Sequence, residues 1–307
     1  MTNNKYPQIL LLGNGINRVY GCNSWDDLIG RIAKGGSYGE NLPMPMRIVL
    51  ATNNQVESQL SVFLSNEISN LNGHITNPNM RTTLRRILSM GFSDILTTNY
   101  SYELEIAATD QERISKRQLI KTRKHTMAVR RAEGKYYLHT YQEVAYGQTM
   151  NRIWHIHGEA RNPSSIVIGH YHYGNLFSKI REYLKLTGNK YAAEQNRQHS
   201  GNECSNYSSN WIDAFIVGDV YVLGFGYNVA EFDLWWLLER KMREKANKGK
   251  VHYYYCKKEA LQTDGRDKLE LLQCYGVTLH PIDEDYNEHL YDLALEMVCH
   301  QMQNSHN

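Results

Sequence analysis

Residues 94–105, with the sequence DILTTNYSYELE, pass from an apolar run to polar residues within a few positions. Ile95 and Leu96 are typical of a buried strand, and Thr98 and Asn99 follow just before a segment that could open a helix. In open α/β sheets, ligands bind at such strand ends. The amide of Asn99 can donate and accept hydrogen bonds at once, which suits a sugar hydroxyl or a water. The alternative is that these polar residues only cap the next helix.

Two other apolar runs end in glycine turns. Residues 9–12 run into Gly13-Asn14-Gly15, and residues 220–223 run into Gly224-Phe225-Gly226. Turns of this kind bring backbone amides close to a phosphate, and a following helix N-terminus favours negative charge. In the first turn, Arg18 stands where a full dinucleotide-binding motif has its third glycine. A plain tight turn is therefore the alternative.

Strand and helix patterns alternate along the C-terminal part of the chain. The expected elements are a helix at 231–245, a strand at 251–255, a helix at 261–275, a strand at 277–279 and a helix at 290–302. Together with the earlier strands, this alternation predicts an α/β fold: a Rossmann-like parallel sheet with helices on both faces. We expect a single domain over residues 1–307, with helical insertions at about 30–90, 108–150 and 172–215.

Residues 153–158, with the sequence IWHIHG, alternate like a further strand and end in a His-Gly pair. Strict alternation predicts that His155 and His157 share one face of the sheet. We expect only His157 at the strand end, beside a glycine where the backbone turns and a ligand can approach. An imidazole pKa of about 6.5 suits a general base near neutral pH. A structural histidine is the alternative.

Three further stretches have two interpretations each. Ser24 followed by Asp26 is a good helix start, which competes with a role at a ligand. The basic segment 116–135 indicates a solvated surface or, as the minor interpretation, a site for an anionic partner or nucleic acid. His170 and His172 lack a carboxylate or cysteine at a familiar ligand spacing, so we expect no metal there.

The composition predicts a soluble protein with a sizeable core: 307 residues are 41% hydrophobic, and the net charge is only +2. This charge balance does not mark the whole chain as a nucleic-acid binder. No apolar run is long enough to span a membrane or to form a signal peptide. The five cysteines are scattered without a CxxC pair, which argues against a zinc site or disulfide framework and for the cytoplasm.

Four of these motifs, in this order, resemble the sirtuin family, also called the silent-information-regulator fold. Residues 13–17 (GNGIN) are similar to the family's Gly-Ala-Gly-Ile-Ser turn, and residues 97–101 (TTNYS) to its Thr-Gln-Asn-Ile-Asp stretch. His157-Gly158 matches its catalytic His-Gly, and residues 224–226 resemble its Gly-Thr-Ser turn. The resemblance covers roughly residues 7–30, 92–108, 151–170 and 218–282.

Sirtuin deacylases carry a four-cysteine zinc module between the His-Gly and the second glycine turn, where this chain has only Cys204. The chain is more similar to the sirtuin-like domains of bacterial antiphage systems. Residues 12–28 resemble their opening, a Gly-Asn-Gly-Ile-Asn-Arg turn followed by Ser-Trp-Asp-Asp-Leu. This resemblance implies an NAD hydrolase that needs no metal. It releases nicotinamide and ADP-ribose and depletes NAD in abortive infection.

The resemblance also implies roles for residues and partners. Asn99 and His157 would be catalytic. The residues expected to contact NAD are Gly13, Asn14, Gly15, Asn17, Ser24, Asp26, Thr98, Gly224, Phe225 and Gly226. We expect a homo-oligomer and a separate sensor or activator, such as an ATPase or a phage component, with no membrane partner. Two other classes stay open: a zinc-free ADP-ribosyl or acyl transferase, and a non-catalytic nucleotide-binding subunit of a defence complex.

Overall fold

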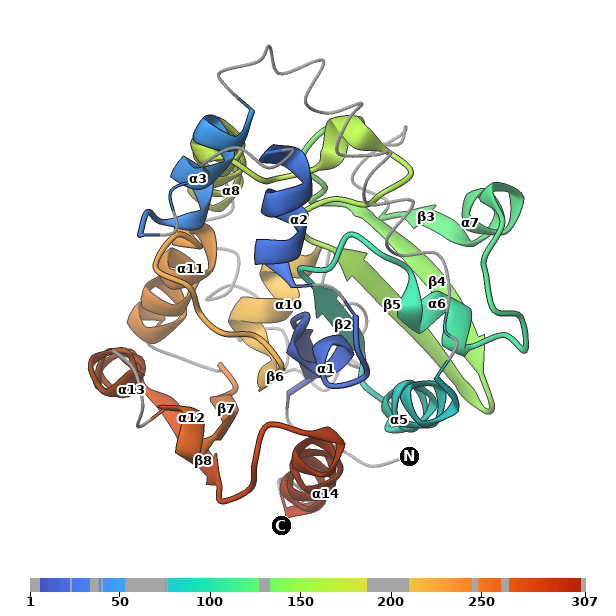
Figure 1. Ribbon diagram of the computed structural model, residues 1–307. Helices are drawn as coiled ribbons and strands as arrows, with labels where there is room; N and C mark the ends of the chain where they lie inside the picture. Colours follow the sequence, from blue (N-terminus) through green and yellow to red (C-terminus); the bar gives the residue numbers. More distant parts are fainter. Residues whose placement is uncertain are drawn as a thin grey trace.

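The computed structural model describes residues 6–22, 24–33, 39, 41–52, 75, 77–126, 133–186, 210–244, 248–260 and 265–304. Within them the chain forms one eight-stranded sheet in the order β3-β4-β5-β2-β1-β6-β7-β8 (Figure 1). The strands are β1 (Gln8–Leu12), β2 (Asp94–Thr97), β3 (Arg123–His125), β4 (Thr140–Tyr146), β5 (Thr149–His155), β6 (Asp219–Leu223), β7 (Val251–Cys256) and β8 (Val277–Ile282).

The six strands from β5 to β8 in this order are mutually parallel, which confirms the predicted Rossmann-like core. The strands β3 and β4 extend one edge in antiparallel fashion. Both expected glycine-turn strands lie in the parallel part. The sheet is therefore mixed, with an antiparallel addition that the sequence pattern did not predict.

Strand β1 occupies the centre of the sheet because its four apolar residues are fully buried on both faces. It pairs with β2 on one side and β6 on the other, so that Leu12 lies opposite both Thr97 and Leu223. The three strands therefore end level with one another. At the end of β1 the chain therefore passes between β2 and β6, two strands that come from distant parts of the sequence. Such a switch point is where open α/β sheets bind ligands.

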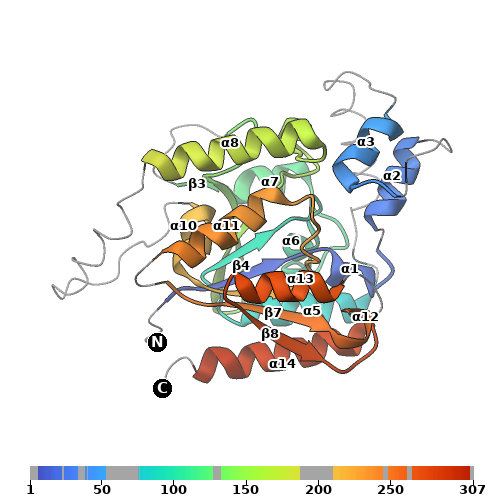
Figure 2. The ribbon, with the colours of Figure 1, turned by 90° about the vertical axis from the view of Figure 1, so that its left-hand side faces the viewer.

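Helices cover both faces of the sheet, as predicted. One face packs against α1 (Gly15–Arg18), α5 (Pro78–Ser89), α6 (Glu103–Ala107), α7 (Lys116–Thr122) and α14 (Glu288–Asn304). The helices α2 (Trp25–Ala33) and α3 (Met44–Ala51) pack on each other past the end of the sheet (Figure 2) and contribute to the same core cluster. The other face packs against α8 (His170–Leu186), α10 (Trp211–Val217), α11 (Phe232–Arg243) and α13 (Gly265–Cys274). Figure 2 shows α8 and α11 above the sheet and α14 below it. The short elements α12 (Lys257–Ala260) and η1 (Pro163–Ser165) lie between strands and helices in the chain.

The expected C-terminal elements are present with small shifts of their ends. Gly276, with φ of +77°, ends α13 as predicted. Strand β5 begins at Thr149, earlier than predicted, and already ends at His155. Parts of the expected insertions, including residues 53–74 and 187–209, lie outside the described residues, and the single-domain assignment stays a prediction. In the described part of the chain, no helix is long and apolar enough to cross a membrane.

Candidate functional site

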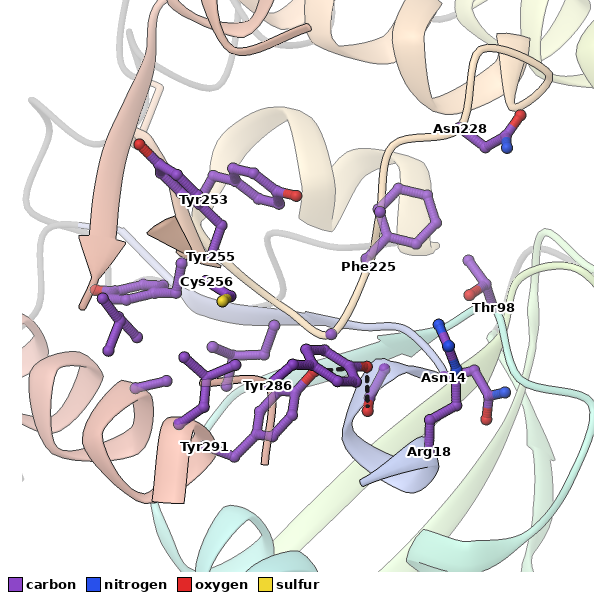
Figure 3. Close-up of a pocket in the computed structure, with 18 of the residues that line it drawn as sticks. Asn14, Arg18, Thr98, Phe225, Asn228, Tyr253, Tyr255, Cys256, Tyr286 and Tyr291 are labelled. Atoms are coloured by element: carbon purple, nitrogen blue, oxygen red, sulfur yellow. Dashed lines mark hydrogen bonds between the residues drawn. The ribbon is translucent and has the colours of Figure 1, made fainter. Parts of the chain in front are cut away.

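A cavity of about 300 Å³ opens at the carboxyl ends of the central strands. Asn14 and Gly15 line it after β1, and Gly224, Phe225 and Gly226 line it after β6 (Figure 3). The two glycine turns that the sequence singled out therefore meet at one cavity. Their meeting follows from the level ends of β1 and β6.

The glycines are needed because the two turns touch through their backbones. The amide of Gly13 donates to Leu223 O at 2.9 Å, and the amide of Gly15 donates to Gly224 O at 2.7 Å. A Cβ atom on Gly13 would stand 2.4 Å from Gly224 O, and one on Gly15 would stand 2.7 Å from the same oxygen. Gly224 itself has φ of +61°. Turn-to-turn contact is thus a reason for these glycines that does not depend on any ligand.

Tyrosines line one side of the cavity (Figure 3). Tyr253 and Tyr255 come from β7, while Tyr286 and Tyr291 come from the start of the last helix and the loop before it. The hydroxyl of Tyr286 donates to Gly15 O at 2.7 Å, which ties this wall to the first glycine turn (Figure 3). Aromatic faces suit a flat, partly polar ring such as a nucleobase. The run Tyr253-Tyr254-Tyr255 at a strand end was the available sequence signal, and it was missed.

The cavity wall also carries polar groups. Arg18, Thr98 and Asn228 line it, with Trp25 and Glu231. Of the described residues on the cavity wall, Arg18 is the only lysine or arginine. A guanidinium at this place can pair with a phosphate. Asn228 and Glu231 follow the second glycine turn closely, but no sequence pattern predicted that they would line the cavity.

Asn99 lies next to the cavity-lining Thr98 but is not itself part of the wall. Its backbone amide donates to Thr97 Oγ1, and its carbonyl accepts a hydrogen bond from His155. The side chain is only 8% exposed, and its amide group makes no hydrogen bond within the described residues. Both the donor and the acceptor of this amide are therefore available to a ligand or a water.

The two histidines do not share a face, so that prediction is wrong. Alternation stops at His155, where β5 ends, and His157 lies in the turn that follows. His155 points into the α6 layer, where its Nδ1 lies 2.7 Å from Asn99 O and its Nε2 lies 2.9 Å from Glu105. Burial would lower the pKa of His155, but Glu105 reverses this and the pKa rises to about 9. His155 is thus a buried cation that holds the Asn99 loop.

His157 lies in the opposite layer and is 1% exposed. Its Nε2 lies 2.8 Å from Asp233 Oδ2 on α11, and its ring meets Tyr173 of α8 edge-on at 5.3 Å. Burial would lower the pKa of His157, but Asp233, and then Glu231, outweigh it and the net pKa is raised. Gly158 follows with φ of +90°, and a Cβ there would stand 2.2 Å from Ser165 O. The glycine of the His-Gly pair is therefore a steric requirement.

A model of the SIR2-like domain family matches residues 93–280, which is more than half of the chain. The chain belongs to the SIR2-like domain family. No curated protein matches it. SIR2-like domains use NAD and are in general NAD-dependent enzymes, so this membership indicates an NAD-related activity. The matched region begins after β1, so the first glycine turn and the tyrosines of the last helix complete the cavity of the SIR2-like domain from outside it.

Four residues expected to contact NAD do not line the cavity of the SIR2-like domain. Ser24 and Asp27 exchange hydrogen bonds at the start of α2, and Asp26 pairs with Arg47 at 2.6 Å. Asn17 is buried beside Asn14, and its Oδ1 has no partner within the described residues. Their part in nucleotide binding stays a prediction, as does that of Gly13, which is not in the wall either.

The other polar stretches have local partners in the SIR2-like domain. His172 is buried in α8 and lies edge-on to Tyr136. Among the described residues, no group of three or more His, Cys, Asp or Glu side chains could hold a metal ion. In the basic segment, residues 116–125 form α7 and β3, and Arg123 forms an ion pair with the buried Glu159.

Proposed function

We propose that this protein hydrolyses the bond between nicotinamide and ribose in NAD, releasing nicotinamide and ADP-ribose. The observation that carries the proposal is the cavity at the switch point, where both glycine turns meet beside Thr98 and Asn99. Its position is that of nucleotide sites in open α/β sheets, and the family is NAD-dependent in general. No metal takes part in the proposed reaction.

The cavity wall suggests how NAD would lie. The turn of Asn14 and Gly15, with Arg18 of the short helix that follows, would hold the pyrophosphate. The adenosine would lie toward Gly224 and Gly226, against the tyrosine wall. The nicotinamide ribose would then point toward Thr98 and its neighbour Asn99.

In the proposed reaction the C1′–N bond breaks, and its electron pair leaves on neutral nicotinamide. The sugar passes through an oxocarbenium-like state, as in glycoside hydrolysis. Asn99 would orient the ribose and the attacking water. His157 would accept the proton of the water or of a ribose hydroxyl, with Asp233 fixing its ring orientation. The water oxygen bonds to C1′ to complete ADP-ribose.

The proposed setting is antiphage defence by NAD depletion in the cytoplasm, which rests on the resemblance of residues 12–28. In that setting the chain would act as a homo-oligomer that a separate sensor or activator switches on. Loss of cellular NAD during phage infection, with the Asn99→Ala strain as control, is the measurement that checks it.

The central test mixes purified protein with NAD and follows nicotinamide and ADP-ribose by chromatography. We expect both products from the wild type, and a loss of at least about 10²-fold in Asn99→Ala and His157→Ala. His289→Ala is the matched control, because His289 is an exposed residue of α14. Equal turnover in all four proteins would contradict the assigned roles. Melting temperatures with and without NAD show whether each variant is folded and binds.

The same test separates the two other classes. A transferase would attach ADP-ribose or an acyl group to a protein instead of releasing free ADP-ribose. A non-catalytic subunit would bind NAD, raising its melting temperature, without turnover even when infected-cell extract is added.

A further inference from the structure

The cavity contains one acidic side chain that the motifs did not indicate. Glu231 precedes α11 and lines the wall, and it is 7% exposed. Among the described residues on this wall it is the only aspartate or glutamate. We propose that Glu231 faces the nicotinamide ribose of bound NAD and stabilises the positive charge that develops at C1′ as the bond breaks. This inference rests on the proposed function and adds a catalytic residue to it.

The carboxylate of Glu231 is held in place by its own turn. Its Oε2 accepts a hydrogen bond from the amide of Asn228 at 3.0 Å, and its amide donates to Asn228 O at 3.0 Å. Asn228 is fixed in turn by the amide of Ala230 and by the indole of Trp235. A charged group that is already fixed in position costs no reorganisation when charge develops in the transition state.

Three other titratable groups interact electrostatically with Glu231. They are His157, Asp233 of α11 and Lys268 of α13. Burial raises the pKa of Glu231 to about 8, while His157 lowers it and Asp233 raises it. A buried carboxyl group of this kind becomes ionised more readily when a cation arrives. NAD brings a fixed positive charge on its nicotinamide ring.

Glu231 and His157 would then divide the reaction between them. The contact of His157 with Asp233 fixes the orientation of the imidazole ring, which suits the proposed transfer of a proton from water to His157. Glu231 borders the cavity and forms no covalent bond: it stays ionised while nicotinamide leaves and water adds to C1′. In glycoside hydrolysis, carboxylates beside the anomeric carbon stabilise the same type of cation.

The experiment compares Glu231→Gln, Glu231→Asp and Glu239→Gln in the full chain. Glu239 lies on the same helix and pairs with Arg243 at the surface, which makes it the matched control. Affinities are measured for NAD⁺ and for NADH, whose nicotinamide ring is neutral, together with NAD⁺ turnover. We expect Glu231→Gln to lose about tenfold or more of the wild-type preference for NAD⁺ over NADH. Turnover should fall by about 10²–10³-fold.

The control Glu239→Gln should match the wild type, and Glu231→Asp, which keeps the charge, should keep the preference for NAD⁺. Unchanged preference or unchanged turnover in Glu231→Gln would overturn the proposal. A wild type that binds NAD⁺ but does not cleave it, even after infected-cell extract is added, would refute the hydrolase. In that case, the preference for NAD⁺ over NADH in the wild type and in Glu231→Gln would still decide whether Glu231 faces the positively charged nicotinamide ring. Absence of binding of both nucleotides to the wild type would overturn both proposals.

Discussion

His155 and His157 are two positions apart, yet they serve opposite layers of the molecule because β5 ends at His155. His155 bridges Glu105 and the carbonyl of Asn99, so it acts on the candidate site through the backbone. His157 contacts Asp233 on the other side of the sheet. The side chain of a residue next to a strand end is thus placed by the turn and not by the alternation of the strand.

His155→Gln should lower the free energy of unfolding by about 3–5 kcal/mol at pH 6, because it leaves the buried Glu105 without its cation. The pKa of His155 is about 9 in the folded protein and about 6.5 in the unfolded chain. The stabilisation is therefore complete below about pH 6.5 and is lost as the pH rises through 9. Urea unfolding of both proteins from pH 6 to 9.5 measures this, with His289→Gln as control. A difference that does not change with pH would contradict the ion pair.

NAD⁺ affinity should rise with pH in the wild type, because Glu231, with a pKa of about 8, is increasingly ionised between pH 7 and 9. In Glu231→Gln we expect this rise to disappear, whereas in Glu239→Gln it should remain. Isothermal titration calorimetry with NAD⁺ at several pH values measures the affinity of each protein. An equal rise in Glu231→Gln would show that Glu231 is not the group that causes the pH dependence.

At the scale of elements, the site depends on two glycine turns that rest on each other. The amides of Gly13 and Gly15 bond to the ends of β6 and its turn, so the two loops form one support. This contact holds Asn14 and Phe225 in the cavity wall. The turns are therefore both part of the packing and part of the candidate nucleotide site.

Gly13→Ala should destabilise the protein by about 1–3 kcal/mol and weaken NAD binding, because the new Cβ would push the two turns apart. Gly30→Ala in α2 is the matched control, since a Cβ there meets nothing within 4 Å. In the helix it should instead add about 0.5–1 kcal/mol of stability. Thermal melting and NAD titration of both variants measure this. Wild-type NAD affinity in Gly13→Ala would show that the turns do not form the site.

At the scale of the whole molecule, the cavity is lined by segments that are far apart in the sequence, from the turn after β1 to the last helix, α14. Gly15 accepts a hydrogen bond from Tyr286, and Tyr291 and Ala294 of α14 complete the wall. The same helix buries Leu295 and Val298 against the core. The region that matches the family model therefore holds only part of the candidate site.

A chain that stops after Ile282 should lose both stability and NAD binding, because it lacks α14 and the Tyr286 contact. Urea unfolding should show a lower midpoint or no cooperative transition, and titration should detect no NAD binding. The full chain is the control. A truncated chain that binds NAD as tightly as the full chain would exclude α14 from the site.

The sequence by itself determined the α/β class, the ends of β1 and β6 and both glycine turns, because hydrophobic periodicity and glycine placement are local properties. It also pointed to Asn99 and to the His-Gly pair. Only the tertiary structure decided that the side chains of His155 and His157 lie on opposite sides of the sheet. It also decided that Ser24 and Asp26 lie outside the cavity wall, whereas Glu231 and the tyrosines lie in it. These placements depend on contacts between segments far apart in the chain, and on turns where the side-chain alternation of a strand no longer applies.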